Sequence, residues 1–259
     1  MIDIHSHILH GMDDGPARLE DSVELAVAAV NNGVTAIIAT PHHKETFHND
    51  AIKVEQAVKE LNFILNARGI PLYVYPGQEI RAHEKLLEDL ESGKLHTLGS
   101  SSYLLIEFPS SRIPERFEDT IHELSIAGLT PIIAHPERNA EIAGRPERLA
   151  ELVLAGALCQ VTSHSLTGIF GRKVLRLAYT LIQRNLIHLI ASDAHNLTTR
   201  PYQLLEAYNV VSSRFGLSTT EYFKANAYAV LHNLSILRRP YIAPRGPGRL
   251  LAGWPSFKI

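Results

Sequence analysis

Histidine and aspartate side chains recur at the ends of short apolar runs in this chain. In order along the sequence they are Asp3, His5, His7, His42, His135, Asp193 and His195. Short β-branched runs bounded by turn residues are typical of buried strands, and parallel α/β barrels build their active sites at the carboxyl ends of such strands. One histidine after one strand indicates little. The same placement after four runs predicts a metal cluster.

Acidic side chains add oxygen donors to this set. Glu79 and Glu107 each follow an apolar run, where an ionised carboxylate is costly to bury without a cation or a donor; an arginine partner would serve as well as a metal. Asp14 lies in an Asp-Asp-Gly loop that by itself indicates an ordinary acidic turn. Imidazoles and carboxylates without thiolate suit Mn, Fe or Zn, and bridging carboxylates commonly hold two ions about 3.5–4 Å apart. The five imidazoles, together with the carboxylates of Asp14, Glu79, Glu107 and Asp193, make nine candidate ligands, which fit two or three ions better than one.

Basic residues near these runs suggest an anionic ligand. Arg138 follows His135 by three positions, and a guanidinium beside a metal cluster can bind phosphate through two hydrogen bonds. An ion pair with Glu137 or Glu141 is the alternative. His43 and Lys44 follow His42 directly, and their role stays open.

Composition narrows the class of protein. The 259 residues carry a net charge of −2, which predicts no nucleic-acid partner. Cys159 is the single cysteine and lies in an apolar run, so we expect neither a disulfide nor a thiolate site. The chain has no apparent leader and no apolar run near the ~20 residues that span a bilayer, so we expect a cytoplasmic protein without membrane insertion.

Strand and helix patterns alternate along the chain. We expect strands near residues 1–5, 35–40, 72–76, 103–107, 130–135, 157–162 and 187–192. We expect helices near residues 19–32, 50–68, 83–91, 114–127, 146–155, 170–185 and 200–214. This order fits a doubly wound sheet or an incomplete barrel. Ligands at strand ends far apart in sequence favour the barrel. Residues 236–259 are rich in Pro, Gly and Arg and indicate an irregular tail.

Several motifs together resemble the PHP (polymerase and histidinol phosphatase) superfamily, and within it the bacterial capsule and exopolysaccharide tyrosine-protein phosphatases. These motifs are Met1–His7, Asp13–Pro16, Thr40–His42, Glu107–Phe108, Ala134–Arg138 and Ala191–Asn196. The likeness covers about residues 1–235, which we take as the phosphatase domain, and the tail 236–259 has no counterpart. Asn226-Ala227 stands where an Asn-Pro is expected.

The resemblance implies a distorted (β/α)7 TIM-like barrel of the PHP type with a trinuclear centre. Mn²⁺ is the expected ion, and Fe, Zn or Co are alternatives. One ion would be held by His5, His7, Glu79 and Asp193; a second by Glu79, Glu107 and His135; a third by Asp14, His42 and His195. Arg138 matches the phosphate-binding arginine, and we expect catalytic roles for Arg138, His42 and His195.

The activity implied is hydrolysis of phosphotyrosine by metal-activated water. A phenolate leaving group, with a pKa near ~10, needs little protonation. The expected substrate is the tail of a bacterial tyrosine autokinase that regulates capsular or exopolysaccharide synthesis. An oligomer is compatible with the sequence. A PHP phosphoesterase acting on a histidinol phosphate-like monoester or on nucleotides is the alternative enzyme. A non-catalytic metal-bound module that docks on a kinase is the alternative from another class.

Overall fold

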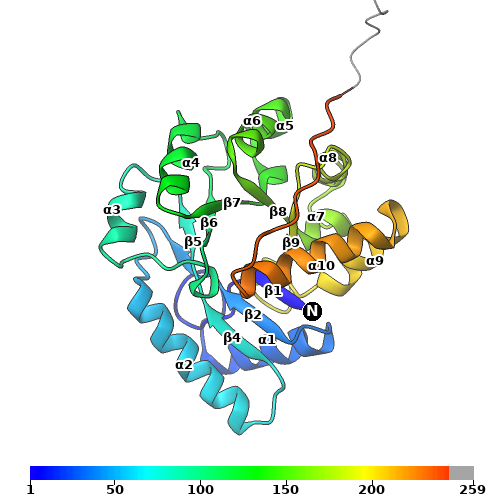
Figure 1. Cartoon of the computed structure of the whole chain (residues 1–259). Coiled ribbons are helices and arrows are strands. Elements are labelled where there is room, and N and C mark those ends of the chain that lie inside the picture. The colour runs from blue at the N-terminus through cyan, green and yellow to red at the C-terminus, as the bar shows by residue number, and fades with distance from the viewer. Residues whose placement is uncertain (245–259) are drawn as a thin grey trace, which may run out of the picture.

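Parallel strands form the centre of the protein, and helices lie around them (Figure 1). The computed structural model describes residues 1–244. The strands are β1 (Ile2–Ser6), β2 (Ala36–Ala39), β3 (His42–His43), β4 (Tyr73–Pro76), β5 (Glu79–Arg81), β6 (Tyr103–Glu107), β7 (Thr130–Ala134), β8 (Leu158–Thr162) and β9 (Leu189–Ala191). They pair in the orders β1-β2-β4 and β3-β5-β6-β7-β8-β9, and every strand pair is parallel.

Two chain segments pass from the first sheet into the second, β2 into β3 and β4 into β5. The second passage contains Gly77, where an added Cβ would lie 2.7 Å from the Ile38 side chain, so the close approach requires glycine. Backbone hydrogen bonds also join β1 to the segment after β9. The amide of His7 donates to the carbonyl of Ala194 at 2.9 Å, and the amide of Asp193 donates to the carbonyl of His5 at 2.8 Å.

The helices follow the strands along the chain. They are α1 (Leu19–Asn31), α2 (Ala51–Ala67), α3 (Leu86–Glu91), α4 (Phe117–Ile126), α5 (Ala140–Gly144), α6 (Glu147–Ala155), α7 (Ser163–Thr167), α8 (Arg172–Gln183), α9 (Leu204–Phe215) and α10 (Leu217–Leu231), with 3-10 turns η1 (Leu98–Ser100) and η2 (Pro136–Arg138). All the strands and helices predicted from the sequence are confirmed, within four residues at their ends. The prediction missed β3, β5, α5, α7 and α10.

Apolar side chains form two clusters that the strands separate, because successive side chains of a strand point to opposite faces. The larger cluster fills the space between strands and helices. The smaller one contains the first residues of β6, β8 and β9 together with Ala227 and Val230 of α10. Helix α10 thus packs at the strands' amino-terminal halves. Their carboxyl ends are left for polar side chains.

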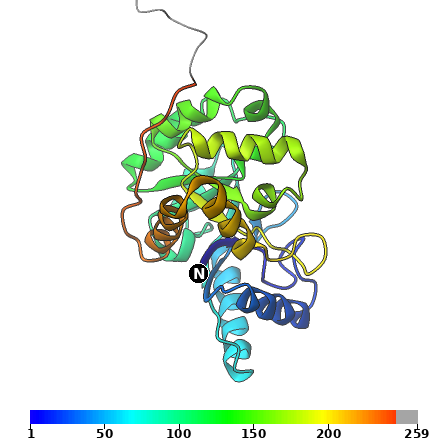
Figure 2. The same cartoon turned by 90° about the vertical axis from the view of Figure 1, so that its right-hand side faces the viewer.

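From the end of α10 to residue 244 the chain forms neither helix nor strand, in agreement with the irregular tail predicted from the sequence (Figures 1 and 2). Its first part lies against the domain: Asn226 exchanges side-chain hydrogen bonds with the backbone of Leu237 at 3.0 and 3.1 Å, and the amide of Ile242 donates to the carbonyl of Arg184 at 3.0 Å. Residues 245–259 of the predicted tail lie outside the described residues. Among residues 1–244, no helix is both long enough and apolar enough to cross a membrane.

Candidate metal centre

The nine predicted metal ligands lie together at the carboxyl ends of the strands. His5 and His42 belong to β1 and β3, Glu79 opens β5, Glu107 ends β6, and the others lie in the loops that follow strands. The set is His5, His7, Asp14, His42, Glu79, Glu107, His135, Asp193 and His195, and each member has a side-chain contact of 4.0 Å or less with another. Asp3 does not join them: it accepts a hydrogen bond from the amide of Ser192 at 2.9 Å.

Glu79 lies at the middle of this cluster. Its Oε1 lies 2.8 Å from Nε2 of His135, and its Oε2 lies 3.0 Å from Nδ1 of His42. The same Oε2 is 3.3 Å from Nε2 of His7 and 3.5 Å from Nε2 of His5. Only 1% of the side chain is exposed. A carboxylate in contact with four imidazoles is suited to bridging two cations.

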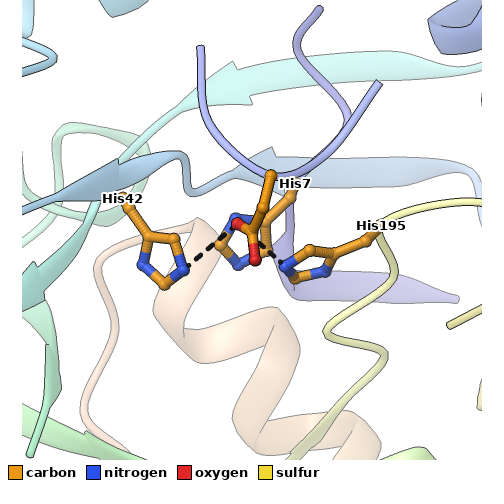
Figure 3. A group of neighbouring side chains, drawn as sticks. His7, His42 and His195 are labelled. Atoms are coloured by element: carbon orange, nitrogen blue, oxygen red, sulfur yellow. Dashed lines mark ion pairs between the residues drawn. The ribbon is translucent and has the colours of Figure 1, made fainter. Parts of the chain in front are cut away.

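Asp193 and Asp14 extend the cluster on either side of His7. Oδ1 of Asp193 lies 3.3 Å from Nε2 of His5 and 3.4 Å from Nε2 of His7. The half-exposed Asp14 lies 3.4 Å from Nε2 of His42 and 3.5 Å from Nε2 of His195. Figure 3 shows His7, His42 and His195 converging from separate parts of the chain, with these ion pairs as dashed lines.

Ligand atoms within 4.8 Å of one another form three groups. These are His7, Asp14, His42 and His195; His5, His7 and Asp193; and His42, Glu79 and Glu107. The groups overlap at His7 and His42. The expected division among three ions puts His7 beside His5 and His42 beside Asp14, and both pairs are neighbours here.

Unpaired polar atoms in the cluster are what ligands without their ions would leave. Nδ1 of His42, Oε2 of Glu79, Oε2 of Glu107 and Oδ1 of Asp193 are buried and make no hydrogen bond of good geometry among the described residues, although Oε2 of Glu79 lies 3.0 Å from Nδ1 of His42 and Oε2 of Glu107 lies 2.8 Å from Nη2 of Arg81. Each such atom ordinarily costs about 1–3 kcal/mol. Their concentration at one place, with N and O donors and no thiolate, fits divalent cations of the Mn, Fe or Zn kind.

Polar neighbours orient the imidazoles. Gln160 Oε1 lies 2.9 Å from Nδ1 of His5, and Asp13 Oδ2 lies 2.6 Å from Nδ1 of His7. Asp13 also accepts from the amide of His42 at 2.9 Å. Contacts of this kind fix which ring nitrogen faces a metal. Neither residue was predicted to have this role, although an amide side chain within the apolar strand β8 was a usable signal for Gln160.

Two arginines reach the cluster. Nη1 of Arg138 donates to Oδ2 of Asp193 at 2.6 Å, so the alternative pairing with Glu137 or Glu141 is wrong. Arg200, which the sequence analysis missed, donates to the same oxygen and lies 2.7 Å from Nε2 of His195. Nothing in its loop sequence separates Arg200 from an ordinary surface arginine.

Opposite charges shift the ionisation of the cluster. Burial alone would raise the pKa of Glu79, but His5 and His42 outweigh it and hold that pKa well below its usual range. Burial would likewise raise the pKa of Asp193, yet His5, His7 and the two arginines lower it well below normal. Burial lowers the pKa of His7, but Asp13 outweighs it and raises that pKa well above normal. The lowered pKa values of Glu79 and Asp193 favour the ionised form, which is the form that binds cations.

Backbone strain marks two of the predicted ligands. His135 has φ of 31° and Asp193 has φ of 53°, both in the left-handed region that non-glycine residues rarely adopt. His135 follows β7 directly, and Asp193 follows β9 after one intervening residue. Strain of this kind is commonly stored at functional sites.

A groove of about 1100 Å³ adjoins the cluster. Its lining includes His43, Lys44 and Arg81, and Arg81 lies 2.8 Å from the predicted ligand Glu107. A smaller cavity of about 80 Å³ lies on the other side of Glu107 and is lined by His135 and Arg138. The groove is large enough to hold a ligand bigger than a phosphate group. The volume of the small cavity matches only one or two small chemical groups.

Comparisons with known proteins agree with this geometry. The family model described as "Capsular polysaccharide synthesis, CpsB/CapC" matches residues 1–232. The tyrosine-protein phosphatase YwqE of Bacillus subtilis is 44% identical over 241 residues, covering 93% of this chain and 95% of the relative. The tyrosine-protein phosphatase CpsB of Streptococcus pneumoniae is 32% identical over 222 residues, covering 83% of this chain and 91% of the relative.

A comparison with solved structures finds the same phosphatases. One described as YwqE from B. subtilis and CpsB from S. pneumoniae, "unique metal-dependent tyrosine phosphatases", superposes with a TM-score of 0.93 at 43% identity, covering 95% of this chain and 100% of that chain. An organophosphorus hydrolase mutant superposes with a TM-score of 0.54 at 13% identity, covering 89% of this chain and 92% of that chain, a likeness of fold alone.

Proposed function

The chain belongs to the CpsB/CapC family of capsular polysaccharide synthesis, and from this premise we propose that it is a metal-dependent protein-tyrosine phosphatase. The observation that carries the proposal is the convergence of nine N and O donors, with the buried Glu79 at their centre and four of their buried atoms making no hydrogen bond of good geometry. A docking module without catalysis would have no need of such a cluster. The alternative phosphoesterases have no comparable support among the relatives.

The ions and their ligands are part of this proposal. We assign the nine residues of the cluster to two or three ions, with Mn²⁺ preferred over Fe, Zn or Co. When bound, such ions lower the pKa of coordinated water and neutralise charge on phosphoryl oxygens. Among the chain's own groups, His42, His195 and the half-exposed Asp14 would together hold one of these ions.

Arg138 and Arg200 supply the chain's positive charge toward the substrate. Both guanidinium groups reach Asp193, so a phosphate placed against the cluster would meet N–H donors from each. A planar guanidinium group can bind two phosphate oxygens through parallel N–H donors. It also stabilises the negative charge that develops on these oxygens. The phenolate of phosphotyrosine then leaves with little help from an acid, since its pKa is near ~10.

We further infer that the fold is a distorted (β/α)7 barrel of the PHP type. Support comes from the hydrogen bonds between β1 and the segment after β9 and from the inner apolar cluster that the strands share. The substrate we propose is the phosphotyrosine tail of a bacterial tyrosine autokinase, with a cytoplasmic location. The boundary between domain and tail near residue 235 remains a prediction.

The choice among substrates is tested by turnover. We expect metal-loaded protein to hydrolyse a phosphotyrosine peptide faster than histidinol phosphate or single-stranded DNA. Preferred hydrolysis of either of the latter would replace the phosphatase assignment with the other phosphoesterase function.

Cysteine chemistry plays no part in the proposed reaction. Cys159 is fully buried in β8, and burial raises the pKa of its thiol far above the ordinary range. We expect iodoacetamide to leave the hydrolysis of an aryl phosphate unchanged, because the thiol is neither accessible nor ionised. Loss of activity that follows modification of Cys159, measured by mass spectrometry, would contradict the metal-dependent mechanism.

A further inference from the structure

Arg138 has a second contact besides the cluster. Its guanidinium carbon lies 5.3 Å from the centroid of the Phe170 ring, while its Nη1 donates to Asp193 at 2.6 Å. Arg138 ends η2, and Phe170 lies just before α8, so two segments separated by 31 residues meet here. A cation within about 6 Å of an aromatic centroid is attracted to the ring face.

Phe170 in turn contacts His164 of α7, with ring centroids 5.4 Å apart and planes 31° apart. His164 is fully buried, and neither of its ring nitrogens has a partner among the described residues. Phe170 itself is half-buried and belongs to neither apolar cluster. Its described aromatic and cationic contacts are therefore to His164 and Arg138, which is unusual for a phenylalanine placed only to fill a core.

The two contacts of Arg138 differ in whether they use its N–H donors. The bond to Asp193 occupies one N–H donor and an oxygen of a residue that we assign to a metal ion. The phenyl ring attracts the guanidinium without using any N–H donor, so it leaves the planar fork free for phosphate oxygens. The ring contact does not depend on Asp193, which we assign to a cation.

We infer that Phe170 is a positioning residue, which holds the Arg138 guanidinium over the cluster for binding the substrate's phosphate. This inference rests on the proposed phosphatase function. His164 fixes the ring of Phe170 from within α7 and does not touch the substrate.

The test uses the metal-loaded full chain with Phe170→Leu, which keeps an apolar side chain of similar size, and Phe170→Tyr, which keeps the ring. We expect Phe170→Leu to lower kcat/KM for a phosphotyrosine peptide about three- to tenfold. It should weaken inhibition by inorganic phosphate by a similar factor, at unchanged metal content and unchanged Tm. Phe170→Tyr should retain wild-type values.

A double-mutant cycle of Phe170 and Arg138 distinguishes a positioning role of Phe170 from a packing role. In an Arg138→Ala background, Phe170→Leu should have no further effect on kcat/KM or on phosphate inhibition, because the group that it positions is gone. Wild-type kinetics in Phe170→Leu, or a full additional loss in the Arg138→Ala background, would overturn the inference. Wild-type protein that hydrolyses no aryl phosphate with any metal would instead overturn the proposed function.

Discussion

Glu79→Gln is expected to lower kcat by at least about a thousandfold and to reduce the amount of bound metal. The carboxylate contacts four imidazoles, and Gln keeps its size but removes the charge on which cation binding depends. The measurement is elemental analysis of the purified variant beside turnover of a phosphotyrosine peptide. Circular dichroism should show that the fold is retained, because the apolar clusters are untouched.

Glu137→Gln provides the matched control. Glu137 is another buried glutamate near the same strand ends, but it accepts hydrogen bonds from the amide of Thr162 at 2.9 Å and the hydroxyl of Ser165 at 2.6 Å. Burial raises the pKa of Glu137, so an uncharged isostere should be tolerated there. We expect this variant to keep its metal and most of its activity. Full activity and full metal content in Glu79→Gln would mean that the cluster is not the catalytic site.

Removing the metal is expected to abolish activity and to change how stability depends on pH. In the metal-free protein, Asp13 and neighbouring carboxylates raise the pKa of His7 well above 6.5, so His7 stabilises the fold fully below that pH. This contribution is lost as pH rises through the folded-state pKa. His195, whose pKa burial lowers to about 4, acts in the opposite sense, but only below about pH 6.5. Above pH 7 the net trend is therefore downward.

Bound metal should reverse this trend, because imidazoles bind cations only when deprotonated. At a metal concentration a thousandfold above Kd, one ion adds about 4 kcal/mol to the free energy of unfolding. We expect the Tm of chelated protein to fall between pH 7 and 9 and that of Mn²⁺-loaded protein to hold or rise. Parallel Tm curves for the two forms over this range would contradict the assignment of His7 as a metal ligand.

The residues of the cluster could be predicted from the sequence because most of them lie at the ends of apolar runs. His42, His135 and Asp193 are separated by many residues, yet the rule that parallel strands share a carboxyl edge places them together without any knowledge of tertiary contacts. Asp13 and Gln160 could not be assigned in this way. Their function lies in facing a particular ring nitrogen of His7 or His5, and that depends on side-chain directions in the folded protein.

Helix α10 was missed for a different reason. Its buried residues, which include Thr219, Phe223 and Val230, share one face of the helix, but several of them are polar (Thr219, Thr220 and Asn226), so the apolar pattern along its sequence is weak. Two adjacent β-branched threonines further weaken the local helix preference. The helix is stabilised by its position against the strands, and that is a property of the completed fold.

The donors that surround Glu79 are drawn from positions as far apart as His5 and His195. A ribosome must therefore translate about three quarters of the polypeptide before the last of them exists. Nascent or prematurely terminated chains would carry an incomplete binding pocket and could not hydrolyse phosphotyrosine. Acquisition of the full set of ions thus requires that synthesis has passed His195 and that the first and last strands have come together.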